Sequence, residues 1–162
     1  MRDIFKTDCV AIVNPVNCKG VMGAGLAKIF KEKYPEVFEK YYKACHAENP
    51  DLRLKIGTCL TCVAHDGKII INFPTKDDWK DKSKMEYIEK GLDALIRHIK
   101  KYDLKSVAIP ALGSGLGGLN WKDVKVLINE KLTDLKLNNG TSVKIDIFEP
   151  IERKYNRKPI ER

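Results

Sequence analysis

The sequence predicts an α/β protein with a mixed, mostly parallel sheet and helices on both faces. Two observations support this prediction. Short runs of apolar and β-branched residues alternate along the chain with longer segments of helical periodicity. A single hairpin signal, Asp66-Gly67, lies between two of the short runs, so one antiparallel pair joins strands that are otherwise connected by crossovers.

Five segments are expected to form strands. They are 9–13 (CVAIV), 57–65 (GTCLTCVAH), 68–74 (KIIINFP), 106–112 (SVAIPAL) and 142–149 (SVKIDIFE). Only Asp66 and Gly67 separate the second segment from the start of the third, and this pair favours a hairpin with a two-residue turn.

Helical segments separate the strands. Apolar residues recur at helical spacing from Leu26 onward, and Pro35 starts or kinks a second segment. Another helix is expected to open at Ser83, because Ser83 and Glu86 form the S-x-x-E pattern of a capping box. Asn120 is a candidate N-cap for a last helix. The predicted order is therefore β-α-β-β-α-β-α-β.

Length and composition narrow the class of protein. A chain of 162 residues fits one domain, 1–162, with a basic tail over 150–162. No apolar run approaches the roughly 20 residues of a membrane span, and the N-terminus lacks the apolar core of a signal peptide. We therefore expect a cytoplasmic protein with no membrane partner. The net charge of +8 favours an anionic partner, nucleic acid foremost, although lysine-rich surfaces also serve solubility alone.

The five cysteines are odd in number and irregularly spaced, which argues against a secreted disulfide framework. Cys59 and Cys62 form one CxxC, but an offset of three along a strand sends the two thiols to opposite faces of the sheet. No second CxxC accompanies them, and the three histidines are scattered. We expect buried free thiols, no metal and no organic cofactor.

Two glycine-rich loops are the strongest functional signal. Seven of the 11 glycines fall in two short windows: Gly20, Gly23, Gly25, Gly113, Gly115, Gly117 and Gly118. We call residues 17–25 the first glycine loop and residues 113–118 the second glycine loop. Each follows a buried strand and precedes a helix, which is the edge of an open α/β sheet where ligands bind. Backbone amides free of side chains make an anion site there, so the pair is expected to hold a pyrophosphate.

Two other interpretations of these loops compete with this one. Gly113, Gly115 and Gly118 match the G-x-G-x-x-G pattern of a Rossmann dinucleotide site. That pattern belongs on the first strand of a βαβ unit, whereas this segment comes late in the chain and only one strand follows it. The second alternative is that the glycines only form tight turns, which would explain the glycines of a single loop as well as a bound ligand would. Two such loops favour the ligand.

The stretch AIVNPVNCKGVMGAGLA (11–27) resembles the signature of the macrodomain family, in which a strand ends in Asn-x-x-Asn and runs into a glycine-rich loop. Asp3-Ile4 resembles the pair that holds adenine in that family, and PALGSGLGG (110–118) resembles its second phosphate loop. The resemblance covers nearly the whole chain in order. It implies a three-layer α/β/α fold that binds ADP-ribose.

The resemblance also implies a set of ligand contacts. Asp3 would accept from the exocyclic amine of adenine, the two loops would hold the diphosphate, and Asn17 would hydrogen-bond the hydroxyls of the distal ribose. The expected ADP-ribose contacts, besides Asn17, are Asp3, Ile4, Asn14, Gly20, Met22, Gly23, Ala24, Gly25, Leu26, Thr75, Gly113, Ser114, Gly115, Leu116, Gly117 and Gly118. For Asp3 alone, a surface charge is the simpler interpretation, as a turn residue is for Asn14 or Asn17; their joint spacing favours the site.

Within the family, the sequence is similar to the branch that contains the terminal ADP-ribose protein glycohydrolases and the DNA ADP-ribosyl glycohydrolases. That similarity makes Lys76, in the sequence FPTK, the expected catalytic residue, with Asn17 beside it. A lysine that leaves a buried strand is partly desolvated, which favours the neutral amine. Such an amine can attack C1″ of the ribose or act as a base, and as a cation it can stabilise developing charge. These roles stay open, as does an ordinary solvated lysine.

The resemblance also indicates a DNA substrate. Protein-directed members of the branch carry an acid where this chain has Gly117-Gly118, and the DNA-directed members share VMGxGLA, FPTK and GLGGLxW. Trp79 and Lys80 are candidate contacts for single-stranded DNA, although Trp79 is equally suited to the core. The expected function is removal of ADP-ribose from a DNA nucleobase, with thymidine as the expected nucleoside, by a monomer acting as antitoxin to a DNA ADP-ribosyltransferase toxin. The alternatives are hydrolysis of ADP-ribose esters on protein Asp or Glu, and ADP-ribose binding without turnover.

Overall fold

A computed structural model describes residues 2–150. Twelve of the 13 residues in the predicted basic tail, 151–162, lie outside the described residues. The fold is built on a five-stranded sheet in the order β2-β3-β1-β4-β5. The strands are β1 (Ala11–Val16), β2 (Leu60–Val63), β3 (Ile69–Pro74), β4 (Ser106–Ile109) and β5 (Lys144–Ile147). Only β2 is antiparallel to its neighbour, so the carboxyl ends of the other four strands lie along one edge.

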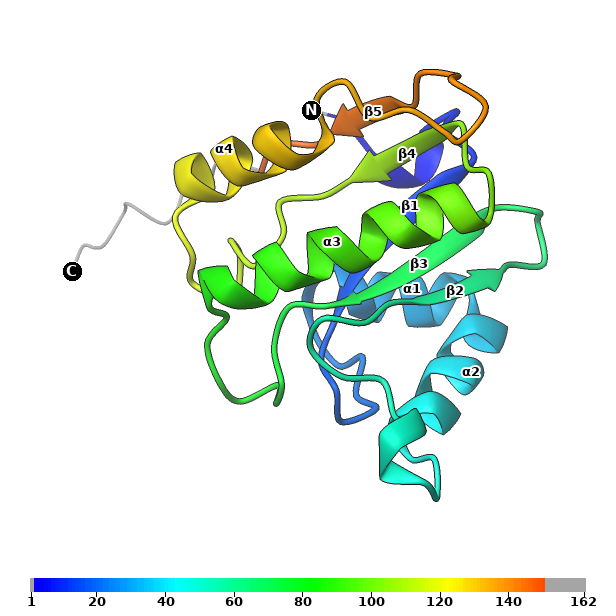
Figure 1. Ribbon diagram of the computed structural model, residues 1–162. Helices are drawn as coiled ribbons and strands as arrows, with labels where there is room; N and C mark the ends of the chain where they lie inside the picture. The colour runs from blue at the N-terminus through cyan, green and yellow to red at the C-terminus, as the bar shows by residue number, and fades with distance from the viewer. Residues whose placement is uncertain (1, 151–162) are drawn as a thin grey trace.

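Helices cover both faces of this sheet (Figure 1). They are α1 (Gly25–Lys33), α2 (Pro35–Cys45), α3 (Met85–Lys101) and α4 (Trp121–Leu132), with short 3-10 turns at Ile4–Lys6 and Pro50–Leu52. The helices α3 and α4 lie on one face, and α1 and α2 lie on the other. The structure thus confirms the predicted order of elements and the three-layer α/β/α fold.

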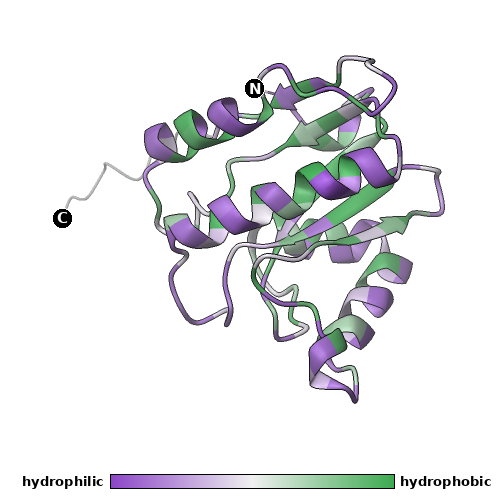
Figure 2. Cartoon of the chain, viewed as in Figure 1, coloured by the Kyte–Doolittle hydropathy of each residue, from purple (hydrophilic) through white to green (hydrophobic). Residues whose placement is uncertain are grey.

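The strands alternate between two cores, as a period of two requires. Ala11, Val13, Ile71 and Phe73 face α3 and α4, while Ile12 and Ile70 face α1. Figure 2 shows the result: hydrophobic strands lie between helices whose outward faces are hydrophilic. In the part of the chain that the structure describes, no helix is long and apolar enough to cross a membrane.

The cysteines confirm the expectation for the CxxC. Cys59 is buried in the core beneath α3, whereas Cys62 is buried in the core beneath α1, so the two thiols lie on opposite faces of the sheet. All five cysteines are free and buried. Burial raises the pKa of the Cys59 thiol to about 12, which makes it a poor metal ligand.

The first strand lies further along the chain than predicted, at Ala11–Val16 in place of 9–13. It continues through Pro15 because β4 pairs with β1 only along Ala11 and Ile12. Proline has no amide hydrogen to donate to a neighbouring strand. At Pro15 this has no cost, because β4 no longer pairs with β1 there.

The hairpin also differs from its prediction. The last ladder bond runs from the Ala64 amide to the Lys68 carbonyl at 2.8 Å, so the loop holds three residues, 65–67, in place of two. Gly67 adopts φ 89°, the left-handed conformation that closes such a three-residue loop.

The predicted capping box at Ser83 is wrong. The helix α3 begins at Met85 with Lys84 as its N-cap, and no side chain caps it. The Ser83 hydroxyl is buried without a hydrogen-bond partner among the described residues. The backbone amide of Ser83 donates to the carbonyl of Gly117 at 3.0 Å. This tertiary contact with the second glycine loop therefore replaces the local cap. The cap predicted at Asn120 is confirmed, because its Oδ1 accepts from the Lys122 amide at 2.9 Å.

Candidate functional site

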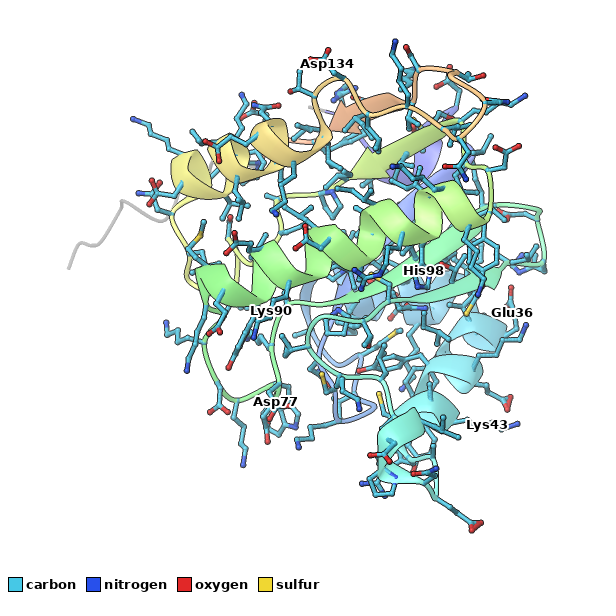
Figure 3. The ribbon with its side chains drawn as sticks, viewed as in Figure 1. Glu36, Lys43, Asp77, Lys90, His98 and Asp134 are labelled. Carbon is cyan, nitrogen blue, oxygen red and sulfur yellow. The ribbon has the colours of Figure 1, made fainter. Side chains whose placement is uncertain are left out.

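Lys76 and Asn17 follow the carboxyl ends of two adjacent parallel strands. The strands β3 and β1 are in register up to Pro74 and Val16, and the Thr75 amide donates to the Val16 carbonyl at 2.8 Å. Beyond the strands, the Cys18 amide donates to the Asp77 carbonyl at 3.0 Å. Figure 3 labels Asp77 at this point, where the segment after β3 meets the first glycine loop. The backbones at the two predicted catalytic residues are therefore held next to each other.

The Lys76 side chain is half-buried. Its Nζ lies 3.4 Å from the carbonyl oxygen of Trp79, a long contact in which the amine donates. Thr75 is 6% exposed, so the strand delivers Lys76 directly from the core to the surface. This is the position that the sequence predicted for a catalytic amine.

The amide group of Asn17 holds the first glycine loop in shape. Its Nδ2 donates to the Val21 carbonyl at 2.7 Å, and its Oδ1 accepts from the Lys19 amide at 2.9 Å. The Tyr41 hydroxyl lies 2.8 Å from the same Oδ1. The sequence predicted a ribose contact for Asn17, with a turn residue as the simpler interpretation of this asparagine alone, and the bonds to Val21 and Lys19 are those of a residue that shapes a turn. With Oδ1 occupied, the second hydrogen of Nδ2 is what remains for a ligand.

Cys18 lies next to both predicted catalytic residues, but its thiol is not a nucleophile. Its Sγ lies 3.6 Å from the Lys76 carbonyl. Burial, with the nearby Asp77 carboxylate, raises the pKa of the Cys18 thiol to about 12. The thiol therefore stays protonated at neutral pH. Among residues 2–150, no group of three or more His, Cys, Asp or Glu side chains could hold a metal ion.

Packing explains some of the predicted glycines without any ligand. A β-carbon on Gly20 would lie 2.8 Å from Nε2 of His46, and one on Gly113 would lie 2.8 Å from Cδ1 of Leu119. Gly117 is more restricted still, because a β-carbon there would collide with Oγ of Ser83 and the carbonyl of Gly113. At these three positions, atoms of the protein itself leave no free space for a side chain.

Other glycines have no such explanation. A β-carbon on Gly115 would meet no atom within 4 Å, and the φ of this residue lies outside the left-handed region. A β-carbon on Gly23 would meet only Cγ1 of Val21, at the ordinary distance of 3.4 Å. Within residues 2–150 no atom excludes a side chain at these two positions, so glycine here leaves room for an external group to approach the backbone closely.

The two glycine loops lie close to each other. A β-carbon on Gly25 would lie 3.6 Å from Cδ1 of Leu116, which is 67% exposed at the tip of the second loop. Ala24 is the extended N-cap of α1 and supplies no side-chain cap, so the first amides of that helix are left for another acceptor. Ser114 and Leu26, which are both half-buried, lie close in sequence to Leu116 and Gly25, the two residues of this contact. The arrangement suits an anion held between two loops.

Two predicted ligand contacts, Asn14 and Met22, have side chains that the protein itself buries. Asn14 is completely buried, and Met22 is 2% exposed. Asn14 donates through Nδ2 to Oδ1 of Asn72 at 3.1 Å, and the same nitrogen lies 3.9 Å from Sδ of Met22. The Asn14 side chain in β1 therefore contacts the buried Met22 of the first glycine loop and ties this part of the loop to β3 through Asn72.

Asp3 and Ile4 lie at the far end of the sheet edge, beside β5. Asp3 is exposed and accepts from the Phe5 amide at 3.0 Å, while Ile4 is 7% exposed and anchors the turn in the core. Asp3 lines a cavity of about 420 Å³ together with Arg2 and Phe148. The Arg2 guanidinium lies 4.0 Å from the centre of the Phe148 ring. The sequence motifs do not single out Phe148, which falls inside the predicted strand 142–149; only the structure ends β5 at Ile147 and leaves Phe148 directly after it.

The segment that carries Lys76 also reaches the second glycine loop. We call residues 76–84 the lysine-rich segment. Trp79 is 54% exposed, so it does not belong to the core. A β-carbon on Gly118 would lie 3.3 Å from Nζ of Lys82, a residue that the sequence does not distinguish from its neighbouring lysines. No local pattern marks Lys82, because its position depends on contact with Gly118, a residue far away in the sequence.

Known proteins resemble this chain in both sequence and fold. The model of the family described as Macro domain matches residues 13–128. The DNA ADP-ribosyl glycohydrolase of Mycobacterium tuberculosis is 47% identical over 123 residues, which cover 76% of this chain and 35% of that protein. The solved macrodomain of Mycobacterium tuberculosis DarG superposes with a TM-score of 0.83 and 41% identity, covering 94% of this chain and 95% of that one.

A second relative combines two activities in its name. The DNA ADP-ribosyl transferase-DNA ADP-ribosyl glycohydrolase fusion protein of Thermosipho africanus is 33% identical over 166 residues, covering 94% of this chain and 41% of that protein. The structure of Thermosipho africanus DarTG in complex with ADP-ribose has a TM-score of 0.80 at 33% identity, again covering 94% and 41%. The chain thus spans well under half the length of these curated relatives.

Proposed function

This chain belongs to the macro domain family, and we propose that it removes ADP-ribose from a nucleobase of DNA, with thymidine as the nucleoside. The relatives named DNA ADP-ribosyl glycohydrolase support the reaction class. The observation that carries the proposal is the juxtaposition of Lys76 with Asn17 at the ends of adjacent strands, next to two loops with unexplained glycines.

The proposed ligand lies along the edge formed by four parallel strands. In sheet order this edge presents Lys76 after β3, the first glycine loop after β1, the second glycine loop after β4, and Phe148 after β5. Adenine binds at the Asp3 end, the diphosphate lies between the loops, and the distal ribose lies next to Lys76. The exposed amides around Gly23 and Gly115 meet the diphosphate oxygens.

The proposed reaction replaces the base at C1″ of the distal ribose by the oxygen of water. The bond between C1″ and the base nitrogen breaks, and the departing base takes a proton. Asn17 orients the ribose through the free hydrogen of Nδ2. Lys76 acts at C1″ as a nucleophile or base when neutral, or stabilises developing negative charge when protonated.

The proposed partner is a DNA ADP-ribosyltransferase toxin whose modification this chain reverses. The Thermosipho africanus fusion protein supports this pairing, because its name joins a transferase to a glycohydrolase in one chain. We propose that the chain acts as a monomer.

The test compares wild type with Lys76→Ala on two substrates: an ADP-ribosylated single-stranded oligonucleotide and a protein that carries ester-linked ADP-ribose. We expect wild type to release ADP-ribose from the oligonucleotide, and Lys76→Ala to be slower by about 100-fold or more. ADP-ribose affinity, measured by calorimetry, should change little. Lys43→Ala is the matched control, because Lys43 is an exposed lysine on α2, far from Asp77 in Figure 3.

Other results would replace the proposal. Turnover of the protein ester alone would identify a protein-directed hydrolase. Tight ADP-ribose binding with no turnover of either substrate would identify a binding module.

A further inference from the structure

The lysine-rich segment presents Trp79 to solvent beside the proposed catalytic amine. The indole is 54% exposed, although large aromatic side chains are highly buried on average. The carbonyl of the same residue lies 3.4 Å from Nζ of Lys76. In the proposed function, whatever is joined to the ribose at Lys76 therefore leaves the site next to Trp79.

A tight turn fixes the position of Trp79. The Asp81 amide donates to the Asp78 carbonyl at 3.0 Å, and the Lys80 amide donates to Oδ1 of Asp78 at 3.1 Å. Trp79 and Lys80 are the two central residues of this turn, so their side chains point outward. The segment is also tied at both ends, by the Cys18–Asp77 bond to the first glycine loop and by the Ser83–Gly117 bond to the second.

Lys82 places one cation on the other side of this turn. Its Nζ lies 3.3 Å from the point where a β-carbon on Gly118 would be, so the ammonium group lies over the second glycine loop. The charges of the whole segment nearly cancel, because residues 76–84 hold four lysines, Lys82 included, and three aspartates. Asp77 is in addition 4.0 Å from the ammonium group of Lys19. A net charge of one is too small to bind a polyanion strongly, so the exposed ring is the stronger attraction.

We propose that the lysine-rich segment is the binding surface for the single strand that carries the ADP-ribose: a base of the strand stacks on the Trp79 indole, and one phosphodiester pairs with Lys82. This inference rests on the proposed function and adds to it the surface that selects a polynucleotide over a modified protein. Stacking on an aromatic side chain tolerates any base, so the surface recognises a strand and not a sequence.

Fluorescence tests the stacking directly, because the chain has two tryptophans. The other one, Trp121, donates through Nε1 to Oε1 of Glu149 at 2.8 Å and is half-buried at the start of α4. In a Trp121→Phe variant, Trp79 is the only indole. Titration with an unmodified single-stranded oligonucleotide should quench its emission to a plateau. Emission that does not change up to millimolar oligonucleotide would overturn the proposal, whether or not the protein turns over DNA.

Kinetics with the ADP-ribosylated oligonucleotide supply the second test. Trp79→Ala should raise KM about tenfold, in line with the loss of one stacked base, while Trp79→Phe retains most of the affinity. ADP-ribose affinity should stay unchanged. Tyr102→Ala is the matched control: Tyr102 is 45% exposed, has Nζ of Lys101 5.3 Å from its ring centre, and lies beyond the opposite end of α3. That helix of 17 residues is about 25 Å long.

Lys82→Ala should reduce the slope of log affinity against log salt by about 0.7, the value for one phosphate of a single strand. An unchanged KM in Trp79→Ala, or an equal loss of ADP-ribose affinity, would overturn the proposal. A wild-type protein inactive on the oligonucleotide would instead refute the proposed function, and the fluorescence titration would still decide whether this surface binds a strand.

Discussion

The amide of Ser83 donates to the carbonyl of Gly117 at 3.0 Å, and the Ser83 side chain fills the space that a β-carbon on Gly117 would need. This contact joins the lysine-rich segment to the second glycine loop. It also explains why position 117 has no side chain, a feature that the sequence linked to the phosphate loop and to substrate choice. An acid at this position would require the two segments to separate.

Gly117→Ala should therefore destabilise the fold. The new methyl group meets Ser83 and the Gly113 carbonyl, and relief of such overpacking costs about 1–3 kcal/mol. Urea denaturation would measure the change in the free energy of unfolding. Gly115→Ala is the matched control, because its β-carbon meets no atom within 4 Å. Equal stability of the two variants would contradict this account of the loop.

Gly115→Val should leave the free energy of unfolding nearly unchanged but weaken the binding of ADP-ribose. The protein has room for the side chain, so the free energy of unfolding should fall by less than about 1 kcal/mol. ADP-ribose affinity by calorimetry should fall at least tenfold, because the isopropyl group would occupy the space assigned to the diphosphate. Unchanged affinity would remove the second glycine loop from the site. Gly25 is a less clean choice, since its φ of 59° penalises any side chain.

Asn14→Ala tests whether this asparagine supports the loop or contacts the ligand. The substitution leaves Oδ1 of Asn72 without its buried donor, which costs about 1–3 kcal/mol of unfolding free energy. The exposed Asn129→Ala on α4 should change stability by less than about 0.5 kcal/mol. Lost ADP-ribose affinity at unchanged stability would show that the ligand reaches Asn14 directly.

His98 should make stability depend on pH. Its Nδ1 lies 2.7 Å from Oγ1 of Thr61, and burial, with Lys101 and Arg97 nearby, lowers the pKa of His98 below its ordinary value of 6.5. The unfolded chain thus takes up this proton at a higher pH than the folded protein does. The contribution of His98 is present above about pH 6.5 and is lost as the pH falls through its folded pKa. Urea midpoints at pH 7.5 and 5.5 should differ less in His98→Gln than in wild type; an identical difference would exclude His98 as the cause.

Much of the fold could be predicted from local pattern. Helical and strand periodicity indicated every helix and strand in order, because side-chain periods of 3.6 and 2 reflect which face is buried. The failures were local signals that tertiary contact overrode. Ser83 has the pattern of a cap, yet its amide finds a fixed partner in Gly117. The Asp66-Gly67 pair marks a turn correctly, but strand register set the loop at three residues.

The sequence alone determined the inventory: two side-chain-free loops after strands, and a lysine at the end of a third strand. The tertiary structure decided what each residue does. It buried the side chains of Asn14 and Met22, exposed Trp79, and placed Lys82 over Gly118. The physical reason is that burial and close approach depend on contacts between segments far apart in the chain, and local periodicity does not encode which segments meet.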